Sequence, residues 1–312
     1  MYLIVLIVLY FYLYSKEKLK MTNNKKAIFY AVLAAALYAI NAPVSKLLLN
    51  KIPSTMMAGL LYLGAGIGMY TLEKFNRHKE ELPLTKKELP YTATMVILDI
   101  AAPIFLMIGL TKCSAANASL LNNFEIVATS LIALFIFREA ISKKLWLAII
   151  LVTISSILLS FEDMSSLQFS WGSLFVLLAC VCWGFENNCT RMLSSKNPAQ
   201  IVTIKGFGSG IGALILSFVI GERFFQMGYI LFALILGFIA YGLSIYFYIY
   251  AQRDLGAAKT STYYAISPFI GAGLSLVIFS EIPSIIFILA LAIMAVGTYC
   301  ASTERLDNHF SS

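Results

Sequence analysis

Long apolar blocks are the feature that most constrains how this chain can fold. They occupy 98–110, 145–159, 211–220, 230–249 and 285–299 and alternate with short polar joints. With its flanks, each block approaches the roughly 20 residues that an α-helix needs to cross about 30 Å of hydrocarbon. The blocks lack the period-two alternation of an outer-membrane barrel. The pattern therefore predicts an all-α integral membrane protein.

The composition is typical of a chain that spans a membrane several times. Of its 312 residues, 60% are hydrophobic and only 12% are charged, whereas a soluble domain carries about 25% charged residues. We expect ten transmembrane helices, joined by loops too short to hold a soluble domain. The predicted spans are 27–49, 53–72, 89–111, 113–137, 144–161, 169–192, 198–220, 225–251, 256–280 and 284–302.

The first residues pose a separate question. As a helix, the apolar stretch 1–14 would reach only about 21 Å, which is shorter than the hydrocarbon core. No basic region precedes it, so the pattern of a secretory signal peptide is not met. We therefore describe 1–26 as an N-terminal segment that is either an extra short apolar helix or the product of an upstream start codon. We favour the second alternative, with Met21 as the true start.

The distribution of basic residues predicts the orientation. Cytoplasmic loops carry an excess of Lys and Arg, and most of the 23 Lys and Arg residues fall in joints on the side where the ten-helix core begins. We expect a multi-pass protein of the cell membrane with both ends of this core in the cytoplasm, including the tail 303–312. The net charge of +7 then reflects the basic residues of the cytoplasmic joints, and no nucleic-acid partner is expected.

Residues that could carry catalysis or bind a metal are scarce. The two histidines, His78 and His309, lie in polar segments, and the five cysteines lie in or beside apolar helices. Such a pattern offers neither a cluster of metal ligands nor a nucleophile with its base. We expect no metal, no cofactor and no enzymatic activity.

An internal repeat divides the chain into two halves. We predict repeats at 27–161 and 169–302, each with five helices. Because five is an odd number, the second copy enters the membrane from the opposite side, as in secondary transporters whose substrate site lies near the midplane between the halves. The matched pairs are YAINAPVSKLLLNKIP (38–53) with WGFENNCTRMLSSKNP (183–198), GAGIG (64–68) with GSGIG (208–212), SAANAS (114–119) with GAAKTS (256–261), and IALFIFRE (132–139) with LSLVIFSE (274–281).

These repeats resemble the EamA domains of the drug/metabolite transporter superfamily. Pro268 also fits the family's ninth helix, whereas Ile126 at the matching position of the fourth departs from it. The resemblance covers about 27–302. It implies ten helices, cytoplasmic termini and movement of small metabolites through a central cavity, without fixing the substrate. The residues that carry it are Tyr38–Asn41, Trp183–Glu186, the Ala-Ala pairs of the fourth and ninth helices, and the Phe-x-Glu ends at Glu139 and Glu281.

Two carboxylates stand out near the middle of predicted helices. A charge at the centre of a helix costs ~2.5–3.5 kcal/mol on insertion scales, so such residues usually face a cavity or a partner. Asp99 and Glu125 have no basic neighbour at helical spacing, and Asn122 lies one turn before Glu125. The two carboxylates predict a site for an ammonium group, a proton, or both in exchange. The alternative is that each is a protonated carboxyl hydrogen-bonded between helices.

Other polar residues and aromatic side chains accompany these carboxylates. Glu186 is predicted either to line the site or to pair with Lys205 as a structural contact or inner gate. Lys46 is expected to reach the membrane interface. Aromatic faces can bind an ammonium group with ~0.5–2 kcal/mol. The predicted substrate-binding set is Asp99, Glu125, Asn122, Tyr38, Asn41, Trp183, Glu186, Asn187, Tyr241 and Tyr263.

The function expected from these features is secondary transport of small amine-bearing metabolites by alternating access. Among such transporters, an amino-acid exporter or exchanger is the form that we favour. The partners are then a small-molecule substrate, protons as a coupling ion, and the lipid bilayer. One alternative is a carrier of quaternary ammonium compounds or cationic drugs. A remote alternative is a flippase for lipid-linked substrates, which would favour a basic head-group patch over the acidic residues seen here.

The predicted orientation can be tested by labelling. In a background without native cysteines, His78→Cys and His309→Cys should react with a membrane-impermeant thiol reagent only after the cells are permeabilised. Lys51→Cys, in a joint on the opposite side, should react in intact cells and serves as the control. Strong labelling of His78→Cys in intact cells would contradict the predicted topology and the inversion of the repeats.

Overall fold

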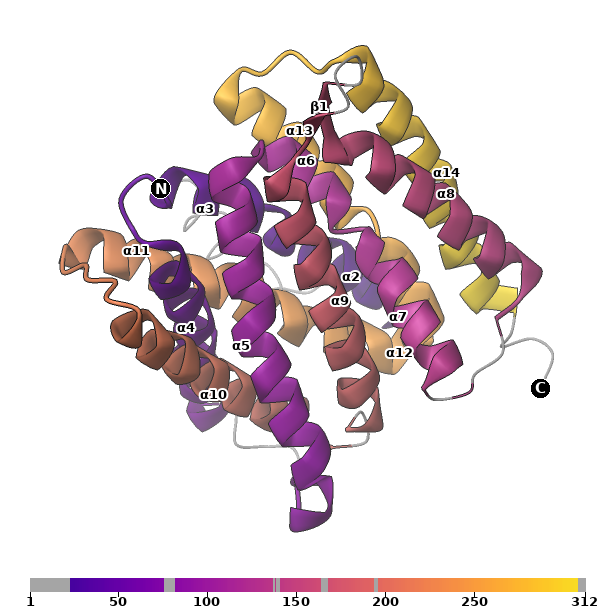
Figure 1. Cartoon of the computed structure of the whole chain (residues 1–312). Helices are drawn as coiled ribbons and strands as arrows, with labels where there is room; N and C mark the ends of the chain where they lie inside the picture. Colours follow the sequence, from indigo (N-terminus) through magenta and orange to yellow (C-terminus); the bar gives the residue numbers. More distant parts are fainter. Residues whose placement is uncertain are drawn as a thin grey trace.

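The computed structural model is a bundle of helices and describes residues 23–75, 82–136, 138, 141–163, 168–193 and 196–307 (Figure 1). Most of the predicted N-terminal segment lies outside these residues, as do His78, Glu139 and His309. The first half contains α2 (Asn23–Ala39), α3 (Asn41–Leu48), α4 (Ser54–Phe75), η1 (Lys86–Glu88), α5 (Leu89–Lys112), α6 (Ala115–Leu121), α7 (Phe124–Phe135) and α8 (Lys143–Ser160).

The second half repeats this order. A short antiparallel hairpin, β1 (Phe161–Asp163) and β2 (Gln168–Phe169), joins it to the first. Among the described residues, nine helical spans are long and apolar enough to cross a membrane, and α13 is shorter. The ten predicted helices are thus present. The elements are α9 (Trp171–Met192), α10 (Pro198–Val219), α11 (Met227–Gly237), the π-helical turn η2 (Phe238–Leu243), α12 (Ser244–Tyr264), α13 (Ser267–Phe279) and α14 (Ile285–Asp307).

Two predicted helices are broken in the middle. The first breaks at Ile40, between α2 and α3, because Pro43 has no N–H to donate to the carbonyl one turn earlier. The fourth breaks at Asn122 and Asn123, where no proline is present. Here the amide of Asn123 bonds to the carbonyl of Leu120 at 3.3 Å, so a side chain competes with the helical ladder.

The boundary between the eighth and ninth helices differs from the prediction. We expected a joint between 251 and 256, but α12 continues without interruption to Tyr264. The stretch contains no proline, so nothing removes a backbone donor until Pro268, at the start of α13. As a result α13 has 13 residues and forms the second part of a broken ninth helix.

The packing follows the symmetry expected of an inverted repeat. Two helices pack on their own counterparts in the other repeat, α4 on α10 and α8 on α14, and α6 of the broken fourth helix packs on α13 of the broken ninth. The pair α5–α9 likewise corresponds to the pair α12–α2, with the two repeats exchanged. The contacts between the halves are therefore related by a pseudo-twofold axis.

Glycines in and just before the repeated GxGIG motif allow these close contacts. A Cβ atom on Gly206 would lie 2.3 Å from the backbone nitrogen of Gly66, so α10 and α4 touch through their backbones. A Cβ atom on Gly64 would lie 2.0 Å from the carbonyl oxygen of Leu234 on α11. Close packing through small residues is how membrane helices associate, since lipid removes most of the hydrophobic drive.

At each end of the bundle, a helix N-terminus of one repeat is hydrogen-bonded to the other repeat. At the start of α4, the carboxylate of Glu222 accepts hydrogen bonds from the N–H groups of Thr55 and Met56, at 3.3 and 2.9 Å. At the start of α10, Asn197 caps the helix and its own N–H donates to the Leu82 carbonyl at 2.9 Å. We call these contacts the α4 latch and the α10 latch.

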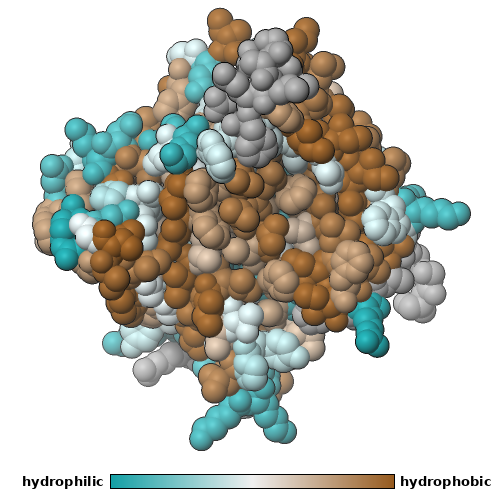
Figure 2. All heavy atoms as spheres, in the orientation of Figure 1, coloured by the Kyte–Doolittle hydropathy of each residue, from teal (hydrophilic) through white to brown (hydrophobic). Residues whose placement is uncertain are grey.

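The outer surface suits a hydrocarbon environment. Large apolar side chains are widely exposed, such as Phe135 at 74%, Val219 at 76% and Val277 at 78%. Figure 2 shows hydrophobic residues over most of one face, with hydrophilic residues gathered toward its edges. A soluble monomer rarely exposes such large apolar areas, so the chain is a multi-pass membrane protein.

The close approach of α4 and α10 yields a stability prediction. Gly206→Ala should destabilise the fold by about 1–3 kcal/mol, because the added methyl group meets backbone that cannot move aside. Gly273→Ala is the matched control, since a Cβ atom there meets nothing within 4 Å. The midpoint of thermal unfolding in detergent measures both. Equal midpoints for the two variants would contradict the packing described.

Candidate functional site

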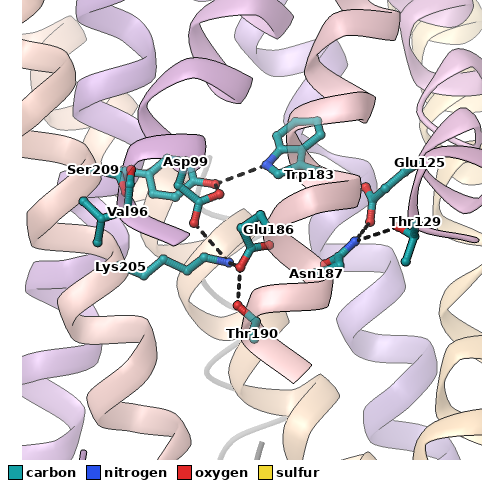
Figure 3. Close-up of polar contacts among 11 residues, drawn as sticks. Val96, Asp99, Glu125, Thr129, Trp183, Glu186, Asn187, Thr190, Lys205 and Ser209 are labelled. Atoms are coloured by element: carbon teal, nitrogen blue, oxygen red, sulfur yellow. Dashed lines mark hydrogen bonds and ion pairs between the residues drawn. The ribbon is translucent and has the colours of Figure 1, made fainter. Parts of the chain in front are cut away.

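A buried ion triad lies between the two repeats. The Nζ atom of Lys205 on α10 is 3.2 Å from an oxygen of Asp99 on α5 and 2.8 Å from an oxygen of Glu186 on α9 (Figure 3). The exposed fractions are 0% for Asp99, 2% for Glu186 and 8% for Lys205. The hydroxyl of Thr190 donates to Glu186. The triad therefore ties α5 of the first repeat to α9 and α10 of the second.

The charges of the triad do not cancel. Two carboxylates face one ammonium, so the fully ionised triad carries one negative charge. Burying unbalanced charge is costly in a protein and more so at membrane depth. A proton or a cationic group is needed to neutralise it. The second oxygen of Asp99 has only the Lys205 ammonium, at 3.2 Å, as a polar partner among the described residues.

Aromatic side chains form a wall beside the triad. The hydroxyl of Tyr62 on α4 donates to Asp99 at 2.9 Å, and the indole N–H of Trp183 points to the Tyr62 oxygen at 3.5 Å. The ring of Tyr241 lies 5.0 Å from that of Tyr62. Tyr241 belongs to the π-helical turn η2, and such turns often occur at functional sites.

Glu125 belongs to a different cluster. Its carboxylate accepts a hydrogen bond from the Asn187 amide at 2.5 Å, and the same amide lies 3.5 Å from the hydroxyl of Thr129. Asn187 follows Glu186 along α9, but Figure 3 shows that the two side chains leave the helix in different directions. The structure thus separates Asp99 and Glu125, which the sequence analysis treated as one site.

The remaining predicted residues gather around the helix breaks. The Asn41 amide donates to the Tyr241 hydroxyl at 2.9 Å, and Tyr38 packs edge-on against Tyr241 at 5.8 Å. Together with Asn122, Asn41 and Tyr38 line a small cavity. Tyr263 is half-buried at the end of α12, where its neighbour Tyr264 is the residue that packs on Tyr38.

Two expectations need correction, and one residue of the site was not predicted. Asp99 has a basic partner after all, because Lys205 comes from another helix and cannot be found by spacing within α5. Lys46 does not simply reach the interface, since its Nζ donates to the carbonyls of Leu110 and Cys113 and so caps α5. Tyr62 was missed. The only signal for it was a tyrosine in an apolar stretch, two residues before the GxGIG motif.

Comparison with known proteins identifies the family to which this fold belongs. The sequence profile of the EamA-like transporter family matches residues 25–161 and 170–303, one match in each repeat. The chain belongs to the EamA-like transporter family. It is therefore a transporter of the drug/metabolite superfamily, as the resemblance in the sequence implied.

Two proteins named as transporters are similar to this chain over most of its length. An "Uncharacterized transporter" of Methanothermobacter thermautotrophicus is 25% identical over 288 residues, which cover 86% of this chain and 83% of that protein. The "Uncharacterized transporter YyaM" of Bacillus subtilis is 22% identical over 254 residues, covering 77% and 83%. Both names support membrane transport as the activity.

Solved structures show the same fold. One, titled "Crystal structure of protein", superposes with a TM-score of 0.66 and covers 89% of this chain and 96% of its own. The two sequences are 14% identical. At this identity the likeness concerns the fold, and the substrate must be argued from the side chains of this EamA protein itself.

The triad predicts a large cost for removing its only cation. Lys205→Met should destabilise the protein by about 3–5 kcal/mol, because two buried carboxylates lose their partner. Adding Glu186→Gln should restore part of that stability. The control is Lys196→Met, which breaks the more exposed pair with Glu88 at 3.3 Å and should cost about 0–1 kcal/mol. Thermal unfolding in detergent compares them, and similar losses for the two lysines would contradict a special role for Lys205.

Proposed function

We propose that this EamA protein carries small amine-bearing metabolites, with amino acids as the main substrate class, across the cell membrane by alternating access. The observation that carries the proposal is the ion triad of Asp99, Glu186 and Lys205 between the repeats. In secondary transporters built from inverted repeats, the substrate site lies near the midplane at this interface.

Both charges of an amino acid find a counterpart in the triad. The carboxylates of Asp99 and Glu186 suit an ammonium group, and the ammonium of Lys205 suits a carboxylate. A zwitterion can enter by exchanging these internal ion pairs for pairs with itself, so the buried charges stay compensated. Because a zwitterion carries no net charge, the surplus carboxylate needs a proton whether or not the amino acid is bound, which supports a proton carried together with the substrate as the coupling.

A carrier of quaternary ammonium compounds or cationic drugs is the second candidate. The net negative charge of the triad and the aromatic rings of Tyr62 and Trp183 favour it, because cations bind over aromatic faces. However, a cationic substrate that has no carboxylate group offers nothing to the ammonium of Lys205, whose only partners among the described residues then remain Asp99 and Glu186. This difference separates the two candidates experimentally.

A matched set of ligands provides the test. The midpoint of thermal unfolding of the purified protein is measured with alanine, with ethylamine, which lacks the carboxylate, and with propionate, which lacks the amine. The proposal expects alanine, or a larger amino acid from the same panel, to raise the midpoint well above either fragment. Stabilisation by ethylamine and tetramethylammonium, with none by amino acids, would instead support the cationic carrier.

Substitutions in the triad should abolish transport while the protein still reaches the membrane. Asp99→Asn and Glu186→Gln keep the size of the side chain but remove a charge that binds the substrate. The loss of such a contact weakens binding by about 2–5 kcal/mol, or about 30-fold or more. Glu125→Gln is also expected to reduce transport, since its carboxylate meets Asn187 beside the triad helix α9.

The control for these variants is Glu281→Gln, which changes an exposed carboxylate at the end of α13. Uptake into proteoliposomes, normalised to the amount of protein inserted, compares all four variants. If Asp99→Asn and Glu186→Gln transport amino acids at the rate of the unmodified protein, the triad is structural and the proposed substrate site is wrong.

A further inference from the structure

A small cavity lies where broken helices from the two repeats meet. It has a volume of about 10 Å³, enough for about one particle the size of a water molecule. It adjoins the break between α2 and α3, the break between α6 and α7, and the start of α13. Its walls are Tyr38, Ala39, Asn41, Ala42, Ser119, Asn122, Ser267, Pro268 and Gly271.

Three buried oxygen atoms in the cavity wall need a partner. They are the hydroxyls of Ser119 and Ser267 and the amide oxygen of Asn122, and none has a hydrogen-bond partner among the described residues. The exposed fractions of these residues are 2%, 0% and 8%. A buried polar group without a partner is costly, so three around one cavity indicate that something binds there.

The repeat explains why the cavity exists. In the alignment of 114–119 with 256–261, Ser267 corresponds to Glu125, and in that of 38–53 with 183–198, Ala42 corresponds to Asn187. Glu125 and Asn187 are hydrogen-bonded to each other in their own half. At the related place the shorter side chains of Ser267 and Ala42 leave a gap. The pseudo-twofold axis thus relates a filled position to a hollow one.

The chemistry of the wall selects the ligand. Amide and hydroxyl oxygens are hard, neutral ligands that suit an alkali cation. A divalent cation would call for carboxylates, and the wall contains none. The hydroxyl oxygens of Ser119 and Ser267 make no hydrogen bond among the described residues, so their lone pairs are available to a cation. In membrane transporters, unwound backbone carbonyls and the C-terminal ends of half-helices coordinate Na⁺ or protons at helix breaks, and Asn122 lies at the C-terminal end of α6.

The charge of the surroundings also favours a cation over a neutral water molecule. The ion triad, with two carboxylates and one ammonium, carries one surplus negative charge. The cavity connects to the triad through the hydrogen bond from Asn41 to Tyr241, whose ring packs on Tyr62. A monovalent cation here reduces the excess of buried negative charge.

We infer that this cavity is a binding site for a dehydrated monovalent cation, for which Na⁺ is the probe. Ser119 and Asn122 come from the first repeat and Ser267 from the second. A cation bound by all three joins the two halves, and its affinity changes when the halves move apart. The site is distinct from the ion triad and does not depend on the identity of the organic substrate.

The test uses the purified full-length protein without any substrate, at constant pH and ionic strength. NaCl is exchanged for choline chloride or KCl, and the midpoint of thermal unfolding is followed. Na⁺ should raise the midpoint by roughly 5–10 °C at about 100 times its dissociation constant. Binding of radioactive ²²Na⁺ should reach one ion per chain. A midpoint that is equal in NaCl, KCl and choline chloride, with no ²²Na⁺ bound, would show that only water occupies the cavity and overturn the inference.

Matched serine variants assign the effect to the cavity. Ser119→Ala and Ser267→Ala should each lose the Na⁺-dependent shift and most of the ²²Na⁺ binding. Ser217→Ala is the control, because its hydroxyl is also buried with no partner in the described part of the chain but lies on α10, away from the cavity. It should keep the full shift. If Ser119→Ala does not fold, Ser267→Ala and the direct binding measurement decide. Equal loss in Ser217→Ala, or full binding in both cavity variants, would place any Na⁺ elsewhere.

Discussion

The absence of water inside a bilayer is the constraint on which this structure depends. Every buried charge must find a partner from another helix, because no solvent is available to stabilise it. Lys205 satisfies Asp99 and Glu186 together, and so binds α10 to helices from both repeats. With two carboxylates and one ammonium, the triad still needs one positive charge to become neutral. The surplus carboxylate is costly to bury, but a proton or a cationic ligand can neutralise it. The triad is therefore both a structural link between helices and a candidate binding site.

Small residues have the complementary role of bringing helices close enough for such pairs to form. The contact of Gly206 with Gly66 places the backbones of α10 and α4 against each other, one residue away from Lys205. A bulkier residue would move the lysine away from its acids. Packing and electrostatics are thus coupled in adjacent residues of one helix. The exposed apolar surface, by contrast, has only to match lipid, so it tolerates many sequences.

Much of the fold could be predicted from the sequence, because apolar blocks and repeated motifs are local patterns. The breaks at Ile40 and before Pro268 have a local cause, the missing N–H of a proline. The break at Asn122 has no such signal. The partners within the site could not be predicted, since periodicity along α5 cannot show that Asp99 faces Lys205 of α10. Tyr62 was missed for the same reason, because its role comes from the helix it faces.

The α4 and α10 latches also bear on how a carrier of this kind spends its cycle. The first consists of hydrogen bonds from two backbone N–H groups to the Glu222 carboxylate. The second combines the Asn197 cap with the nearby ion pair of Lys196 and Glu88. In the alternating access proposed above, the two latches differ in chemistry and need not break with equal ease, so the empty carrier has a preference for one of its two states. That preference sets the waiting state and hence the rate, whereas the gradients across the membrane alone set the direction of net flow.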